Sequence, residues 1–124
     1  MPNPVKCTRL YADGEGESHF EDIEFDMASM QFAPPAPALD VSDPIDTTNV
    51  SWMRFPEGWH DAAHLPPRRQ LFIVVAGEIE VSTSTGQARI FKPGDFLLGE
   101  DITGKGHGAR ALNGEVLAVI IALG

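Results

Sequence analysis

Glycine, proline and short polar turns interrupt the second half of the chain so often that no long regular element fits between them. The apolar or alternating segments there are brief, covering residues 71–76, 78–82, 88–91, 96–98 and 115–123. None of them has a convincing helical period, and residues 78–82 alternate as a half-buried strand does. Many short strands at close spacing favour an all-β barrel or sandwich over a helical or α/β fold.

Two turns between these segments are predicted from the residue types that form them. Ser84-Thr85-Gly86 lies between two predicted strands and indicates a hairpin. Lys92-Pro93-Gly94-Asp95 is a second tight turn, in which proline presets the first corner and glycine is free to take a positive φ. The strand of residues 96–98 should follow it directly.

The first half has a different texture. Residues 8–11 and 19–25 show short alternations typical of strands, and Asp13-Gly14-Glu15-Gly16 between them predicts a turn. Residues 33–46 contain four prolines, whose missing amide donors exclude a central strand or a helix interior. We therefore expect residues 1–49 to supply N-terminal strands and an extended Pro-rich arm packing on a barrel of residues 50–124, all within one structural domain.

Charge and length limit the function classes. The chain has 124 residues, which is the size of a single domain, and a formal net charge of −9. That charge repels phosphate backbones and anionic bilayers, so neither nucleic acid nor a membrane is an expected partner. No apolar run approaches the ~18 residues of a spanning helix, and the N-terminus has no secretion signal, so we expect a cytoplasmic protein. Cys7 is the only cysteine and is expected to be a bystander.

Two spaced motifs resemble those of the cupin superfamily. In the first, Gly58-Trp59-His60-Asp61-Ala62-Ala63-His64 is followed by Gln70, and six residues separate Gln70 from Gly77. In the second, Pro93-Gly94-Asp95 is followed by a strand and then by Gly104-Lys105-Gly106-His107. Together with Arg68-Arg69-Gln70, these phrases look like small bacterial single-domain cupins without a settled function. The resemblance implies a jelly-roll β-barrel with a ligand site at its mouth.

The same resemblance implies a weakened metal site. His64, Gln70 and His107 occupy ligand-like positions, but glutamine stands where such cupins usually have glutamate. His60 lies four residues before His64 instead of two and has no secure counterpart, while His19 is a candidate to complete the shell. First-row metal sites normally include a carboxylate that offsets the cation's charge. We therefore expect at most weak binding of zinc, iron, nickel or manganese.

Strand geometry adds candidates for ligand binding. Residues two apart on a strand share a face, so Arg68 should sit at the rim if Gln70 faces the cavity. An arginine there could hold a carboxylate or phosphate, and the alternative is a surface ion pair with Glu100 or Asp101. Trp59 and Asp101 complete the set of ligand-binding candidates, although a tryptophan can equally serve to cover apolar surface.

Two function classes remain, with a structural partner module as a third. The first is a small-molecule binder or sensor, which the missing glutamate favours. The second is a metal-dependent dioxygenase or isomerase acting on a small anionic substrate, with His64 and His107 as ligands; a metal-free enzyme would use His107 as its catalytic base. We also expect a homodimer, because edge strands are commonly buried by pairing with a copy. The predicted core combines one face of residues 71–76 with Ile79, Val81, Phe91, Phe96, Leu98, Leu117, Val119 and Ile121.

Overall fold

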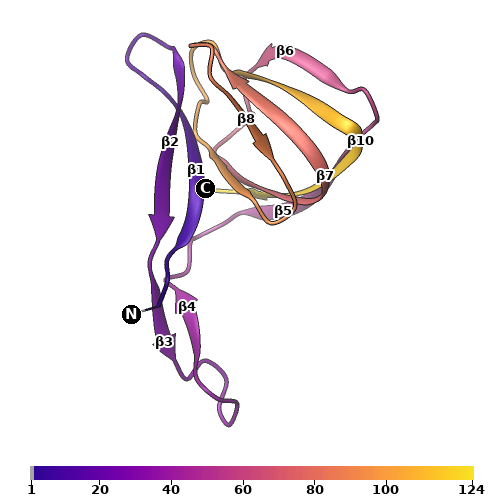
Figure 1. Ribbon diagram of the computed structural model, residues 1–124. Coiled ribbons are helices and arrows are strands. Elements are labelled where there is room, and N and C mark those ends of the chain that lie inside the picture. Colours follow the sequence, from indigo (N-terminus) through magenta and orange to yellow (C-terminus); the bar gives the residue numbers. More distant parts are fainter. Residues whose placement is uncertain (1) are drawn as a thin grey trace.

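The computed structural model describes residues 2–124, and every regular element in that range is a β-strand (Figure 1). The strands are β1 (Val5–Ala12), β2 (Ser18–Phe25), β3 (Met27–Met30), β4 (Leu39–Ser42), β5 (Asn49–Phe55), β6 (His60–His64), β7 (Gln70–Thr83), β8 (Ala88–Phe91), β9 (Phe96–Gly99) and β10 (His107–Ala122). The all-β prediction is confirmed. The described chain has no helix that is long and apolar enough to cross a membrane.

Eight strands form one sheet in the order β2-β1-β9-β7-β10-β5, with β6 paired to β10 and β8 paired to β7. The long strands β7 and β10 run antiparallel and curve with β5 around the interior (Figure 1). Their pairing shifts register between Leu112 and Leu117, opposite Gly77. A Cβ at Gly77, whose φ is +81°, would lie 2.3 Å from the carbonyl oxygen of Glu115, so only glycine fits this bend.

The N-terminal strands are part of this main sheet. β1 pairs antiparallel with β2 and parallel with β9, so residues 5–12 close one side of the barrel. Leu10 is fully buried in the same core cluster as residues of β7 and β10. Strands β1, β2, β5, β7, β8, β9 and β10 therefore share one hydrophobic core.

The core differs in part from the predicted one. Ile79, Val81 and Phe91 are buried as expected, and Phe72 and Val74 form the inner face of the first part of β7. In β9 and β10 the predicted faces are wrong: the buried residues are Leu97, Val116, Ala118 and Ile120, while Phe96, Leu98, Leu117, Val119 and Ile121 face outward. These strands are apolar on both faces, so alternation alone could not identify the inner one. Pairing decides it, because Leu97 and Ile120 lie opposite buried Phe72.

The Pro-rich segment forms a hairpin in place of the expected extended arm. β3 and β4 pair only with each other, and Pro34, Pro35 and Pro37 lie in the loop between them. Figure 1 shows this hairpin projecting away from the barrel. The strands avoid the prolines, so residues 39–42 keep the amide groups that a ladder requires. After the hairpin the chain returns to the barrel, where the amide of Thr48 donates to the carbonyl oxygen of Ala122 at 2.9 Å.

Candidate functional site

A cavity of about 300 Å³ lies inside the barrel, between the inner face of the sheet and the segment that follows β6. Its walls are mainly apolar, and its polar side chains are those of His64, Gln70 and His107. The lining residues are Leu10, Met53, Phe55, Trp59, His64, Pro66, Pro67, Gln70, Phe72, Ile79, Val81, Leu97, Gly99, His107 and Ala109. An apolar pocket with a few convergent polar groups is the usual form of a small-molecule site.

Backbone pairing brings the two histidines of the cavity together. His64 at the end of β6 and His107 at the start of β10 are direct cross-strand partners, with ring centroids 4.5 Å apart. Glycines on either side of His107 make this possible. A Cβ at Gly106 would lie 2.0 Å from the carbonyl oxygen of His64, and one at Gly108 would lie 2.4 Å from that of Ala62. Side chains there would push β6 away and separate the rings.

Each of these imidazoles is anchored through the same ring nitrogen. Nδ1 of His107 lies 2.6 Å from Oδ2 of Asp101, and Nδ1 of His64 lies 2.6 Å from Oδ2 of Asp61. A carboxylate can only accept from these nitrogens, so each Nδ1 carries the proton. In the neutral ring, Nε2 is then a hydrogen-bond acceptor. Both rings therefore have one fixed nitrogen and one available nitrogen.

Asp101 holds His107 in place without lining the cavity itself. Its side chain is completely buried, and within residues 2–124 its second oxygen, Oδ1, is buried without a hydrogen-bond partner. A buried carboxylate with one partner is costly to maintain, so the bond to His107 is its principal stabilisation. The sequence placed Asp101 among the ligand-binding residues, and the structure places it against His107, outside the cavity lining.

The loop that carries Asp101 is held by residues that the sequence analysis missed. Ser18 at the start of β2 is fully buried, and its hydroxyl donates to the carbonyl oxygen of Gly106 at 2.7 Å. Gly16 and Gly104 approach so closely that a Cβ at Gly104 would lie 2.3 Å from the carbonyl oxygen of Gly16. The sequence signal that could have indicated this contact is the pair of glycine-containing turns around Gly16 and Gly104, one in each half of the chain. The β1–β2 turn thus fixes the loop that positions His107.

Arginines gather near the site, but not in the predicted arrangement. Arg9 and Arg69 bind the two oxygens of Glu100, at 2.5 and 2.7 Å. Burial would raise the pKa of Glu100, but the hydrogen bonds and charges of both arginines outweigh it, and the pKa is lowered. Arg68 is exposed and does not line the cavity. Neither expected acidic partner is bound to it, because Glu100 pairs with Arg9 and Arg69 and Asp101 pairs with His107.

The other predicted residues divide between the cavity and the surface. Gln70 and Trp59 line the cavity, and Trp59 packs edge-on against Phe55 with ring centroids 4.9 Å apart. His19 lies outside the lining and pairs through Nε2 with Asp13 at 2.6 Å, so it is not placed to complete a metal shell. His60 is exposed, with Nδ1 3.1 Å from the carbonyl oxygen of Gly58.

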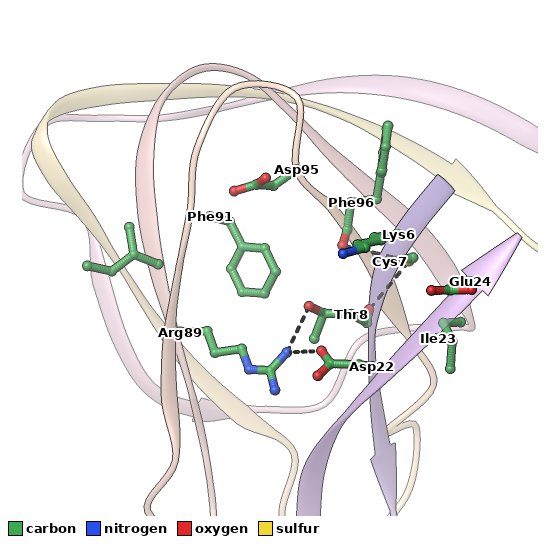
Figure 2. A pocket seen from close by; sticks show the side chains of 11 residues that line it. Lys6, Cys7, Thr8, Asp22, Ile23, Glu24, Arg89, Phe91, Asp95 and Phe96 are labelled. Atoms are coloured by element: carbon green, nitrogen blue, oxygen red, sulfur yellow. Dashed lines mark hydrogen bonds and ion pairs between the residues drawn. The ribbon is translucent and has the colours of Figure 1, made fainter. Parts of the chain in front are cut away.

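A larger, more open hollow of about 650 Å³ lies between β1, β2 and β8 (Figure 2). Its charged lining residues include Lys6, Glu24 and Arg89, and one Arg89 nitrogen donates to Thr8 Oγ1 at 3.1 Å and to Asp22 Oδ1 at 2.6 Å. Cys7 borders it, but burial raises the pKa of the thiol, which disfavours the reactive thiolate. The groove is more open than the cavity and no histidine is among the residues that line it, so we do not consider it the site.

The donor set limits what the cavity could hold. Among the described residues no group of three or more histidine, cysteine, aspartate or glutamate side chains is arranged to hold a metal ion. Asp61 and Asp101 already bind the Nδ1 atoms, so His64, His107 and the neutral amide of Gln70 remain as donors. Such a set suits a weakly held ion, because no ligand carboxylate offsets the cation's charge.

The solved structures that are similar to the chain include the following three. An RmlC-like cupin protein from Desulfovibrio desulfuricans is 17% identical with a TM-score of 0.45, covering 95% of this chain and 82% of that one. A putative ethanolamine utilization protein Q from Salmonella typhimurium is 14% identical with a TM-score of 0.42, covering 98% of both chains. The cupin domain of Schizosaccharomyces pombe Cnp3 is 14% identical with a TM-score of 0.45, covering 100% of this chain and 86% of that one.

No protein-family model and no curated protein matches the sequence. Likenesses as distant as these three concern the fold alone. The described residues form an all-β domain around one hydrophobic core, and two of these three similar structures are described as cupins, the family that the two sequence motifs resemble.

Proposed function

We propose that the barrel cavity binds a small, neutral, largely apolar molecule with a hydroxyl group at one end. The observation that carries this proposal is the pair of imidazoles, each anchored at Nδ1 by a carboxylate, at one end of an apolar cavity. Anchored in this way, Nε2 of each neutral ring accepts a hydrogen bond. A ligand hydroxyl supplies the matching donor, and the aromatic wall of Phe55, Trp59 and Phe72 receives the apolar part.

The charge of the lining favours a neutral ligand over the anion expected from the sequence. Lysine and arginine are absent from the residues that line the cavity, and Arg68 lies exposed outside it. A carboxylate or phosphate would therefore enter without a cationic partner, next to imidazoles that present acceptors. Burying an uncompensated charge costs more than burying a hydroxyl that finds an acceptor. The cavity is at the small end of the size range of ligand pockets, which suits a ligand with a single ring.

Equilibrium binding of three matched probes tests this proposal. Phenol has the ring and the hydroxyl, toluene lacks the donor, and benzoate replaces it with a charge. We expect phenol to bind with a Kd on the order of 1 mM, and more tightly than both other probes. His107→Ala should weaken phenol binding by roughly tenfold, while His60→Ala, which removes an exposed histidine outside the cavity, should leave it unchanged. Equal affinity for toluene and phenol, or tightest binding of benzoate, would contradict the proposal.

A second candidate function is metal-dependent or general-base catalysis at the same residues. Metal-ligating histidines usually donate their second ring nitrogen to a carboxylate, as His64 and His107 do here. His64, His107 and Gln70 would hold the ion, which when bound would act as a Lewis acid. Without it, His107 can accept a proton at Nε2 while Asp101 holds Nδ1, which makes Asp101 a positioning residue.

The metal-dependent function is tested by replacing the neutral Gln70 with a negatively charged glutamate. Protein purified without chelator should contain substoichiometric zinc, iron, nickel or manganese by elemental analysis. Gln70→Glu should raise the content toward one ion per chain, because a carboxylate offsets the cation's charge. A second change, His107→Ala, in the Gln70→Glu background should abolish the gain. Metal content that stays at background in Gln70→Glu would remove metal-dependent catalysis and leave the metal-free functions, which are ligand binding and general-base catalysis by His107.

A further inference from the structure

The outer edge of β2 is an open edge of the main sheet. In the described chain β2 pairs only with β1. In the turn between them the amide of Asp13 donates to the carbonyl oxygen of Glu17 at 2.8 Å. Backbone hydrogen bonds alternate along an antiparallel pair, so the odd-numbered residues of β2 direct their amide and carbonyl groups toward β1. The backbone groups of the even-numbered residues point away from β1.

Side chains of the β7–β8 turn satisfy only the first part of this edge. The amide of Ser18 donates to Oγ of Ser84 at 2.8 Å, and the outward amide two residues later donates to Oε1 of Gln87 at 3.3 Å. These bonds agree with the outward direction of the even-numbered residues. Residues 2–124 provide no such contact for the backbone of Asp22 and Glu24, so this part of the edge is free.

A second free edge borders the same groove. In the described chain β8 pairs only with β7, and the amide of Thr83 donates to the carbonyl oxygen of Gln87 at 2.9 Å where the two strands meet. The same alternation directs the backbone groups of Ile90 away from β7. Ile90 and the free part of β2 both line the groove of about 650 Å³ (Figure 2). This groove therefore has an unpaired strand edge on each side.

Acidic side chains outnumber basic ones in the lining of the groove. The acidic residues are Asp22, Glu24 and Asp95, and the basic ones are Lys6 and Arg89. Arg89 is already bound to Asp22 at 2.6 Å, and within residues 2–124 neither Lys6 nor Glu24 is in an ion pair. The free edge thus borders a groove with an acidic balance, on a chain whose formal net charge is −9.

We infer that the groove binds an extended basic segment of another protein, which adds as a strand to the free edge of β2 at Asp22 and Glu24. Main-chain hydrogen bonds to the edge provide the affinity in this mode of recognition. Every second side chain of an added strand faces the same way, so alternate lysines or arginines can all lie beside the acidic residues. The open groove suits an extended chain, whereas the more enclosed cavity suits a small molecule. This inference is independent of what the cavity binds.

Charge disfavours a second copy as the occupant. If the edge of β2 paired with the same edge of another copy, Asp22 and Glu24 would lie opposite the same two acidic residues. Like charges directly opposite each other destabilise a strand pair, and charged side chains commonly protect edge strands against self-pairing. The net charge of −9 also repels a second copy and an anionic bilayer. The same charges attract a basic strand, so they select the partner that we infer.

Titration calorimetry of the intact chain with three capped peptides tests the inference. The probe is acetyl-Lys-Val-Lys-Val-Lys-amide. One control replaces each lysine with glutamate, and the other is the fully N-methylated basic peptide, which keeps the charges but lacks main-chain donors. We expect the probe to bind roughly tenfold more tightly than either control. Equal binding of the acidic peptide would overturn the basic partner, and equal binding of the N-methylated peptide would overturn strand addition.

Two variants of Glu24 separate its charge from its backbone amide. Glu24→Thr removes the charge and keeps the amide, whereas Glu24→Pro removes both without breaking the ladder to β1, because this amide points outward. We expect Glu24→Thr to weaken binding of the probe by roughly threefold and Glu24→Pro by a further factor of roughly ten. Glu57→Gln changes the net charge equally at an exposed position outside the groove and should bind as the wild type does. Equal affinity of all three variants would contradict a site at the edge of β2.

Hydrogen exchange of the wild-type protein tests the same edge if Glu24→Pro does not fold. The probe should slow exchange of the amides of Asp22 and Glu24, which are free in the unbound protein. Slower exchange centred elsewhere would overturn the inference. Protection of these two amides without peptide, rising with protein concentration, would show that the edge pairs with a second copy and would overturn it as well.

Discussion

Two hollows of this molecule, the groove and the cavity, differ in a way that their sizes do not reveal. The groove between β1, β2 and β8 has about 650 Å³, and the cavity inside the barrel has about 300 Å³. In the groove, Arg89 is bound to Thr8 and Asp22, and no histidine is among the lining residues. In the cavity, carboxylates fix one nitrogen of His64 and His107 and leave the other available. A binding site is therefore better identified by convergent groups with free valences than by volume.

The mutation with the largest expected effect on stability is in the wall between the groove and the core. Phe91 borders the groove but is only 3% exposed and belongs to the core cluster. Phe91→Ala should lower the free energy of unfolding by about 3–5 kcal/mol through lost burial and a cavity. Chemical denaturation measures this loss, with the exposed neighbour Ile90→Ala as the control. A loss below about 1 kcal/mol would show that this wall is not part of the core.

Gly108 tests how the two histidines are brought together. A Cβ at this position would clash with the carbonyl oxygen of Ala62, so Gly108→Ala should displace β6 and cost about 1–3 kcal/mol of stability. It should also weaken phenol binding, because His64 moves away from His107. Gly14→Ala is the control, since a Cβ there meets nothing within 4 Å. Unchanged stability and phenol affinity in Gly108→Ala would show that the close approach of the backbones is not required.

Acid titration tests the charged cluster beside the cavity. Arg9 and Arg69 lower the pKa of Glu100 in the folded state below its ordinary value of 4.5. A lowered carboxyl pKa stabilises the fold above the unfolded-state pKa, and this stability is lost as pH falls through the folded-state pKa. Glu100→Gln should cost about 1 kcal/mol at neutral pH and flatten the decline below pH 4.5. Urea denaturation of the wild type and of Glu100→Gln, from neutral pH to below pH 4.5, measures the free energy of unfolding. If this free energy depended on pH in the same way in both proteins, the lowered pKa of Glu100 would be contradicted.

The smallest effect on stability is expected from a mutation in the groove. Arg89→Ala breaks a surface ion pair in which the side chain of Asp22 is 82% exposed, and such pairs contribute about 0–1 kcal/mol. Phenol affinity should not change, because Arg89 is outside the cavity. A large loss of affinity would place the binding site in the groove.

The sequence predicted the fold well because the signals were local. The turn Lys92-Pro93-Gly94-Asp95 separates β8 from β9 as predicted. Gly77, in contrast, does not end a strand as the sequence suggested, because β7 continues through it from Gln70 to Thr83 and only bends there. The prediction also failed on the faces of β9 and β10, where both sides are apolar and only pairing with β7 selects Leu97 and Ile120 for the core. One face is buried in the barrel, and the other is apolar but turned outward.

The candidate site was only partly predictable for a related reason. His64, Gln70 and His107 carried motif signals and do line one cavity. The function of Asp101 and Ser18 depends on contacts across the fold, to His107 and to the carbonyl oxygen of Gly106, which no spacing rule reveals. Arg68 shows the limit of strand alternation, because it precedes β7 and its side chain is exposed beyond the end of the strand.

The most direct test of the central claim is to locate bound phenol on the protein. Two-dimensional ¹H–¹⁵N NMR of the labelled chain, including the tryptophan and histidine side chains, would follow a phenol titration. We predict that the shift changes concentrate on Trp59, His64, Gln70, His107 and Ala109, and that Nε2 of the two histidines responds while Nδ1 stays bound to its carboxylate. Shift changes centred on Lys6, Asp22 and Arg89 would instead place the ligand in the groove and contradict this account.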